Sequence, residues 1–148
     1  MNKTQTVGQL LRTKGRDAWG VTPDTSAYAA LQLMANKNVE AVLVFNAENL
    51  VGVFSERDYA RKIALKGKSS KYTPIREFMT PIVASVLPEH SIKDCMRLMT
   101  DKRVRHLPVL EDDRVIGVIS IRDALKSLID EQAFVISQLE QYIAGSVQ

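Results

Sequence analysis

The chain has 148 residues, a mass of 16.6 kDa, 45% hydrophobic and 25% charged residues, and a formal net charge of +3. This composition is typical of one globular module and excludes a disordered or fibrous chain, and the length is too short for two independent enzyme domains. The longest apolar run, Ala41–Phe45, excludes a transmembrane helix, and the single cysteine, Cys95, excludes a disulfide framework and a multi-cysteine zinc site. The N-terminal segment also lacks an apolar stretch of signal-peptide length, so we expect a cytoplasmic protein.

In chain order, the first half predicts a helical turn, an extended piece, a helix, a hairpin of two strands and a second helix. The helical turn is marked by the apolar residues Val7, Leu10 and Leu11, and the extended piece ends at Val21, before Pro23. The helix begins at Ser26, and the two strands are Ala41–Phe45 and Leu50–Ser55, joined by the polar connection Asn46–Asn49. The second helix begins just after Ser55. The polar segment Lys66–Tyr72 then leads into a short helical turn over Thr73–Met79, entered at Pro74.

The second half predicts the same order of extended piece, helix, hairpin and helix. The markers are Val86 before Pro88, Ser91 at the start of the helix, His106–Leu110 and Val115–Ser120 around the connection Glu111–Arg114, and Ser120. Ser91 and Asp94 have the spacing of a capping box, and Ile92, Cys95, Met96 and Met99 follow at helical intervals. Cys95 therefore falls on the apolar face of its helix, where we expect a small buried residue rather than a reactive one.

The two halves are copies of one another. Val21–Leu65 aligns without a gap with Val86–Asp130, and thirteen of the 45 positions are identical, where average composition gives about three. Each copy reads β-α-β-β-α and is too small to cover its own apolar face. The sequence therefore predicts an α/β (α+β) fold in which two βαββα repeats pack as a pseudo-twofold pair.

The C-terminal part carries an apolar stripe near helical period that continues past the second copy. Its members are Leu125, Leu128, Ile129, Ala133, Ile136, Leu139 and Ile143. Two arrangements fit this pattern: a helix whose distal part packs on another protomer, or a helix folded back onto its own domain.

The doubled pattern resembles the CBS-domain family, named after cystathionine β-synthase. The resemblance rests on GVFSERD (Gly52–Asp58), GVISIRD (Gly117–Asp123), VRHLPVLEDDRVIGVIS (Val104–Ser120) and the lead-in FMTPIVASVLPEHSI, and it spans about residues 7–130. It implies a stand-alone CBS pair, or Bateman module: residues 1–148 form one module, with a first repeat over 7–66, a second over 73–130 and a helical extension over 131–148. It also implies a homodimer, and clefts that bind an adenine nucleotide such as AMP, ATP or NAD.

The sequence Ser-x-x-Asp ends the second strand of both copies, as Ser55 with Asp58 and Ser120 with Asp123. One interpretation is structural, because Ser at the N-cap and an acid at N3 form a capping box and favour the positive end of the helix dipole. The other interpretation is functional, because a carboxylate at a strand-to-helix junction can accept hydrogen bonds from both vicinal hydroxyls of a ribose. The resemblance favours the second, since these acids match the ribose-binding acid of the family.

The resemblance also pairs the acid of each repeat with the strand start of the other. One cleft would contain Ser55, Arg57, Asp58, Ile82, Val83, Arg105, His106, Leu107 and Pro108. The other would contain Ala18, Trp19, Val21, Glu40, Ala41, Val42, Ser120, Arg122 and Asp123. Because the first offers two cations to a phosphate and the second an acid, we expect the Asp58 cleft to bind the nucleotide more tightly.

Three further residues have competing interpretations. Gly52 and Gly117 mark either a close approach of neighbouring backbone or room for a purine face. Trp19 either stacks on an adenine or covers the edge of the core.

Neither a catalytic nor a metal site is expected, because His106 lacks a nucleophile or carboxylate placed as its partner, and two histidines with one cysteine do not form a metal set. G-x-G-x-x-G and P-loop patterns are absent.

The predicted function is therefore a non-enzymatic sensor that binds an adenine nucleotide and changes its conformation, and this change is recognised by an unidentified regulated protein. The alternative is a ligand-free dimeric scaffold or protein-interaction module. Neither a membrane nor nucleic acid is an expected partner, although residues 1–73 carry 11 Lys and Arg against 6 Asp and Glu.

Overall fold

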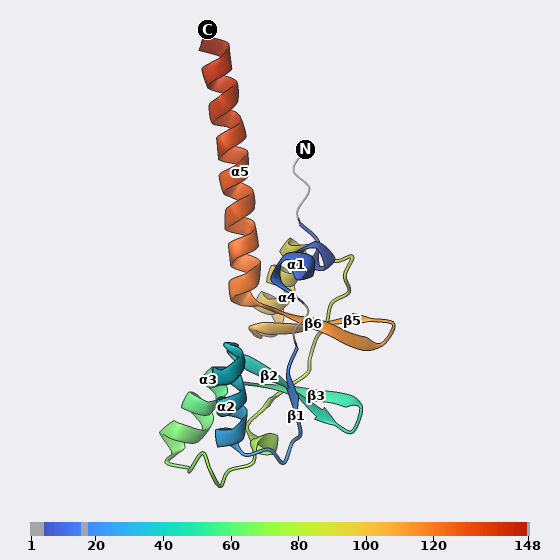
Figure 1. Ribbon diagram of the computed structural model, residues 1–148, viewed down its shortest axis with the longest axis vertical. Helices are drawn as coiled ribbons and strands as arrows, with labels where there is room; N and C mark the ends of the chain where they lie inside the picture. The colour runs from blue at the N-terminus through green and yellow to red at the C-terminus, as the bar shows by residue number, and fades with distance from the viewer. Residues whose placement is uncertain (1–4, 16–17, 148) are drawn as a thin grey trace. The chain divides into compact units, whose positions relative to one another are not determined.

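The computed structural model describes residues 5–15 and 18–147 (Figure 1). The chain forms two compact units, one of residues 18–83 and one that joins the N-terminal segment to residues 84–148. Each unit contains one βαββα repeat, so the mixed α+β fold and the two predicted repeats are confirmed. Among the described residues, no helix combines the length and apolar character that a membrane span requires.

The unit of residues 18–83 contains a four-stranded sheet in the order β1-β2-β3-β4. The short strand β1 (Gly20–Val21) runs parallel to β2 (Ala41–Asn46), and β3 (Asn49–Ser55) is antiparallel to both β2 and β4 (Thr80–Pro81). The two-residue β1 is held to β2 by a hydrogen bond from Leu43 N to Trp19 O. This sheet positions Ser55 at the end of β3, where the next helix begins.

Helix α2 (Ala27–Lys37) covers the core of this unit. It begins at Ser26, whose side chain accepts a hydrogen bond from Ala29 N, as the sequence predicts. It ends at Asn38, which has a φ of 55° and so adopts the left-handed conformation that asparagine tolerates well. The buried core residues are Ala27, Ala30, Met34, Val42, Val44, Phe54, Ile63 and Ile75.

The helix after β3 is irregular. It starts as α3 (Glu56–Asp58), continues as the π-helical turn η1 (Tyr59–Ile63) and ends as the 3₁₀ turn η2 (Ala64–Lys66). A separate 3₁₀ turn, η3 (Ile75–Glu77), follows Pro74 and buries Ile75, which confirms the helical turn predicted over this segment. π-helical turns often occur at functional positions, and this one directly follows Asp58.

The second unit contains the hairpin of β5 (His106–Glu111) and β6 (Arg114–Ser120), with Val86 bridged in parallel to Val109. Helix α4 (Ile92–Lys102) begins with the predicted capping box, in which Asp94 N donates to Ser91 Oγ and Ser91 N donates to Asp94 Oδ2. Helix α5 (Ile121–Val147) starts directly after β6 and is one continuous helix of 27 residues.

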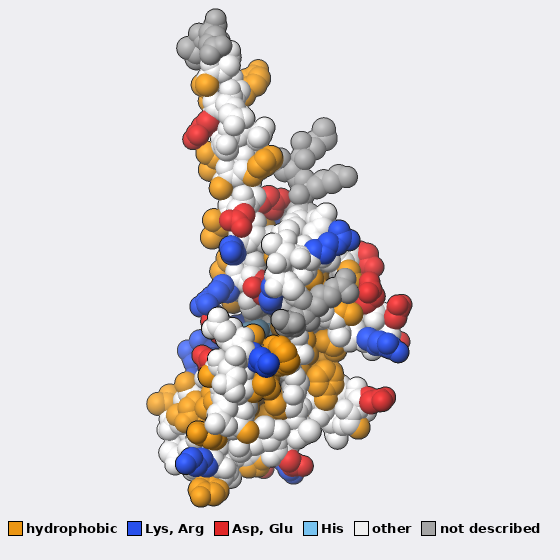
Figure 2. Space-filling model, viewed as in Figure 1, with side chains coloured by type: hydrophobic (Ala, Val, Ile, Leu, Met, Phe, Trp, Pro, Cys, Tyr) orange, Lys and Arg blue, Asp and Glu red, His pale blue; other side chains and the backbone are white. Residues whose placement is uncertain are grey.

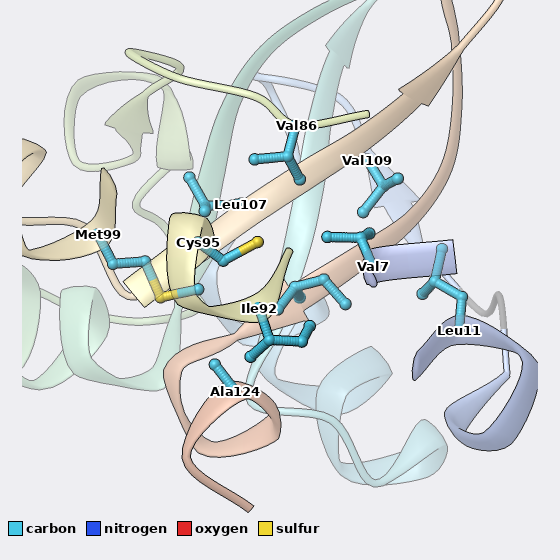
Figure 3. Packing of buried hydrophobic residues seen from close by; sticks show 10 residues of the cluster. Val7, Leu11, Val86, Ile92, Cys95, Met99, Leu107, Val109 and Ala124 are labelled. Carbon is cyan, nitrogen blue, oxygen red and sulfur yellow. The ribbon is translucent and has the colours of Figure 1, made fainter. Parts of the chain in front are cut away.

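The N-terminal segment forms a helix, α1 (Val7–Lys14), rather than a short turn, and it packs into the core of the second unit. Figure 3 shows Val7 of α1 near Ile92 and Cys95 of α4, and Leu11 belongs to the same core cluster. Backbone bonds from Val7 N to His90 O and from Ile92 N to Gln5 O fix this position. The segment that precedes the first repeat therefore completes the core around the second, and in the other unit η3 packs on the first repeat.

Helix α5 does not fold back onto its own domain. Ala124 and Ser127 are buried, whereas Leu125, Ile129, Ile136 and Leu139 are all exposed. Leu128 packs against the core of this unit, so the beginning of the stripe is covered, but the exposed residues beyond it contradict the folded-back arrangement for the distal part of the helix.

Candidate functional site

Both hairpins end at a serine that caps the following helix. Ser55 Oγ accepts a hydrogen bond from Asp58 N at 3.0 Å, and Ser55 N donates to Asp58 Oδ2 at 3.0 Å. Ser120 and Asp123 form the same reciprocal pair, at 3.0 and 2.9 Å. The capping interpretation of both Ser-x-x-Asp sequences is therefore confirmed, and the functional interpretation must rest on what else contacts each carboxylate.

The carboxylate of Asp58 is buried, with 8% of the residue exposed. Its Oδ2 atom accepts from Ser55 N and Ser55 Oγ, and its Oδ1 atom accepts from Thr80 Oγ1 at 3.1 Å. Lys62 Nζ lies 3.0 Å from the same Oδ1 and also donates to Phe78 O. A carboxylate has about four acceptor positions, so the Asp58 side chain is fully hydrogen-bonded within its own unit.

The carboxylate of Asp123 is more open, since 23% of its side chain is exposed. Its Oδ2 atom accepts from Ser120 N and lies 2.5 Å from Lys14 Nζ, which also donates to Val118 O. Within the described part of the chain, both of these contacts fall on Oδ2. The Asp123 Oδ1 atom is therefore the more available acceptor of the two sites.

Two opposing effects set the pKa of Asp123. Burial raises the pKa because it disfavours the charged form, but the hydrogen bonds from Lys14 and Ser120 together with the Lys14 charge outweigh it and lower the pKa below its usual value. The group is thus an ionised acceptor at neutral pH, as a ribose diol would require.

A third capping box, Ser91 with Asp94, shows which of these features capping alone demands. Asp94 makes the same two backbone-linked hydrogen bonds, yet it is exposed, and its hydrogen bonds among the described residues are to Ser91 rather than to a lysine. Burial and a lysine partner are thus not needed for a helix cap. They distinguish Asp58 and Asp123 from Asp94, at the two positions that the family resemblance also selects.

Each unit brings the start of its first hairpin strand beside its own Ser-x-x-Asp. Ala41 pairs with Ser55 and His106 pairs with Ser120 in the strand register. Glu56 N donates to Glu40 O at 3.0 Å, and Ile121 N donates to Arg105 O at 2.8 Å. The further pairing of each acid with the strand start of the other repeat stays a prediction.

The remaining predicted residues have the following surroundings within their units. Val42 and Leu107 are buried in the strands, Ala18 and Val21 are half-buried, and Ile82 and Val83 follow β4 as half-buried and exposed residues. Arg57 and Arg122 are exposed, and each lies next to its acid in the sequence. The carbonyl oxygen of Pro108 accepts a hydrogen bond from Val86 N.

Trp19 packs against the edge of the core, and Lys37 Nζ lies 4.2 Å from the centre of its ring. This contact agrees with the structural interpretation of Trp19, because one face of the ring already carries a cation–π contact. An adenine would have to stack on the other face.

The two glycines make room for the chain itself. A Cβ atom at Gly52 would lie 2.8 Å from Met79 Sδ and 3.0 Å from Thr80 O, and one at Gly117 would lie 2.8 Å from Leu11 Cδ2. At Gly52 the neighbouring backbone of β4 approaches closely, as one of the two interpretations predicted. At Gly117 the equivalent space is filled by the Leu11 side chain of α1.

Three contacting residues, Thr80, Lys62 and Lys14, were not predicted from the sequence. Lys62 had a signal, since it follows Asp58 by four residues on the same helix. Thr80 and Lys14 had none, because 22 and 109 residues separate them from the acids that they contact.

The side chains of Cys95 and His90 lie where the sequence predicted them, the first in the core and the second in a loop. Cys95 is buried in the core, and burial raises the pKa of its thiol to about 11. His90 accepts a hydrogen bond from Leu87 N in the loop before α4. Within the described ranges, no three His, Cys, Asp or Glu side chains are grouped so that they could hold a metal ion.

Comparison with known proteins places this geometry in a family. The model of the CBS domain matches the chain twice, over residues 14–65 and 75–130. The mitochondrial CBS domain-containing protein CBSX3 of Arabidopsis thaliana is 36% identical over 152 residues, which cover 97% of this chain and 74% of that protein.

Two solved structures extend the comparison. A protein of Burkholderia ambifaria described as a signal-transduction protein with CBS domains is 45% identical with a TM-score of 0.79, covering 86% of this chain and 96% of that one. The CBS-domain protein ATU1752 of Agrobacterium tumefaciens is 35% identical with a TM-score of 0.76, covering 83% and 98%. The chain therefore belongs to the CBS-domain family and contains two CBS repeats, an arrangement typical of regulatory and signal-transduction modules.

Proposed function

We propose that this CBS pair binds an adenine nucleotide, AMP, ATP or NAD, through the carboxylates that follow its two hairpins. The observation that carries the proposal is the difference between three capping boxes of the same kind. Asp58 and Asp123 each combine shielding from solvent with a lysine partner, and Asp94 has neither. The two distinguished acids are also those that match the ribose-binding position of the family.

The chemistry of the site suits a nucleoside. A ribose offers two neighbouring hydroxyl donors, and one ionised carboxylate can accept from both. The basic side chains beside the acids, Lys14 and Lys62 with the exposed Arg57 and Arg122, supply the charge that a phosphate needs. An adenine nucleotide therefore meets complementary groups at both its sugar and its phosphate.

Acceptor availability favours Asp123 as the first site to be filled. A ribose at Asp58 must displace Thr80, Lys62 or Ser55, because those donors already use both carboxylate oxygens. At Asp123 the contacts from Lys14 and Ser120 both involve Oδ2, and a diol can approach Oδ1. The sequence had led us to expect tighter binding in the Asp58 cleft, because Arg105 and His106 at the start of the opposite strand would offer two cations to a phosphate. The availability of the carboxylate oxygens favours Asp123 instead.

The function follows from differential affinity. A nucleotide that binds one conformation more tightly shifts the population toward it, and a partner protein then reads the change. We propose that the chain acts in this way as a non-catalytic regulator of another protein. The single buried cysteine agrees with a reducing compartment, and we keep the cytoplasm as the proposed location.

A homodimer is the proposed assembly. A protein of the same fold from bloom-forming cyanobacteria, 22% identical to this chain, is described as hexameric, so self-association is compatible with the fold. The second candidate function is a scaffold that self-associates and binds a partner without any nucleotide. The capping boxes favour it, because they explain both Ser-x-x-Asp sequences without a ligand.

Thermal unfolding with AMP, ATP and NAD separates the two candidates. A nucleotide present at 100 times its Kd should add about 2.7 kcal/mol to the free energy of unfolding and raise Tm. The nucleotide-binding function predicts such a rise with at least one of the three. Unchanged Tm values with all three, at millimolar concentrations, would leave the scaffold as the function.

A further inference from the structure

The described residues of its own unit leave the distal part of α5 uncovered. Every residue from Gln132 to Gly145 except Val135 is exposed. Ile129, Ile136, Leu139 and Tyr142 are 64%, 54%, 57% and 76% exposed. Figure 2 shows hydrophobic side chains along the visible face of this helix. A lone helix of this length is marginally stable in water, so the stripe needs a partner.

Most of the exposed apolar side chains follow a heptad, and Phe134, which is 64% exposed, is the large one that lies on the opposite face. Ile129, Ile136 and Ile143 recur at intervals of seven residues, and Leu125 and Leu139 lie four residues before Ile129 and Ile143. With isoleucine at the a positions, leucine occupies the d positions, and Gln132 is the one polar d residue between them. β-Branched residues at a with leucine at d favour two parallel strands.

We propose that α5 forms a parallel, in-register, two-stranded coiled coil with α5 of a second copy of this chain. The charged residues that flank the seam are few, with only Lys126 and Glu140 at the e positions, so the flanks do not select an oppositely charged foreign helix. The seam is instead self-complementary, since each isoleucine faces its own counterpart.

Gln132 specifies the alignment. In a parallel, in-register pair the two Gln132 amides face one another and can hydrogen-bond, whereas in an antiparallel pair each faces an apolar side chain. A buried amide without a partner is unfavourable, so the antiparallel pair and shifted registers are disfavoured.

The contact area is sufficient for a dimer of moderate affinity. Five side chains on each copy, Leu125, Ile129, Ile136, Leu139 and Tyr142, are between 45% and 76% exposed. Their mutual burial removes on the order of 1,000 Å² from water, near the lower limit of about 1,200 Å² for stable interfaces. We therefore expect a dimer at micromolar concentration that one charged seam residue dissociates.

This inference rests on the homodimer of the proposed function for its partner, and it is independent of nucleotide binding. Sedimentation of the full-length chain without nucleotide tests it. The wild type is expected at twice 16.6 kDa at about 10 µM, Ile136→Glu should raise the dimer Kd at least tenfold, and the outward-facing control Gln141→Glu should leave it unchanged. A monomeric wild type, or an Ile136→Glu variant that dimerises as the wild type does, would overturn the inference.

Oxidative cross-linking tests the orientation. Leu139→Cys places two thiols opposite one another only in the parallel pair, where a disulfide can form, and Gln138→Cys on the outer face is the control. Cys95 is buried and does not compete. A cross-linked Leu139→Cys dimer with an uncross-linked control is expected, and equal cross-linking of both would contradict the parallel seam.

The Ile136→Glu variant also separates the coiled coil from the proposed nucleotide binding. A retained Tm for this variant shows that its core has folded, and nucleotide binding that persists in it shows that the two proposals are independent.

Discussion

Lys14 Nζ lies 2.5 Å from Asp123 Oδ2, although 109 residues separate the two in sequence. In the other unit, Asp58 receives its lysine from Lys62, four residues later on the same helix. Two copies of one repeat thus provide the same charge to equivalent acids by different routes. Lys14 can reach Asp123 only because α1 packs into the unit of the second repeat. This packing brings the N-terminal helix to the candidate site.

Replacing Lys14 by methionine should destabilise the unit that contains α1. The change removes the ion pair with Asp123 and the hydrogen bond to Val118 O, and we expect the free energy of unfolding to fall by about 1–2 kcal/mol. Urea denaturation measures this change. Arg12→Met, an exposed position on the same helix, is the matched control and should stay within about 0.5 kcal/mol of the wild type. Equal losses in both variants would mean that the Lys14 contacts add nothing specific.

The contribution of Asp123 to stability should disappear in acid. Its pKa is lowered in the folded state, so its stabilising effect is complete above the unfolded value near 3.8 and is lost as the pH falls through the lower folded value. The difference in unfolding free energy between the wild type and Asp123→Asn should therefore be constant from pH 7 to about 5 and shrink below about pH 4. Denaturation curves at four pH values test this. A difference that grows on acidification would show that the sign is wrong.

Gly52→Ala should cost more stability than Gly117→Ala. The new methyl group at position 52 meets Thr80 O at 3.0 Å as well as the Met79 side chain, and the backbone of β4 cannot move without disturbing Thr80. At position 117 the close atoms belong to the end of the Leu11 side chain, which can rotate. We expect a loss of about 1–3 kcal/mol at position 52 and less at position 117. Thermal unfolding of both variants makes the comparison, and the reverse order would contradict it.

Local patterns in the sequence were sufficient for most of the fold. The repeat, the N-cap serines 26 and 91 and both hairpins are present as predicted, because capping and strand alternation depend on residues close in the chain. The turns are tighter than predicted, with two residues instead of four. Ala47, Asp112 and Asp113 adopt positive φ values there, which an alanine in particular does not signal.

Long-range placement was not predictable from the same patterns. The apolar spacing of α1 indicates that Val7 and Leu11 are buried, but it does not indicate which repeat buries them. The contact of Lys14 follows from that placement, and the contact of Thr80 follows from the pairing of β4 with β3. The sequence therefore predicted the two acids and missed three of their partners, Lys14, Lys62 and Thr80. It also left the availability of each carboxylate undetermined, since this depends on every donor that surrounds it.

Calorimetric titration of AMP, ATP and NAD into three Asp→Asn variants tests nucleotide binding at the capping acids most directly. Asp94→Asn is the matched control, because it alters a capping box that has neither the burial nor the lysine partner. Loss of a charged hydrogen bond to the ribose should weaken binding about 10- to 100-fold in Asp123→Asn, with a smaller loss in Asp58→Asn and wild-type affinity in Asp94→Asn. Affinity that is the same in all three variants and the wild type would contradict the assignment of these carboxylates to a nucleotide, and a loss confined to Asp58→Asn would reverse the order of the two sites.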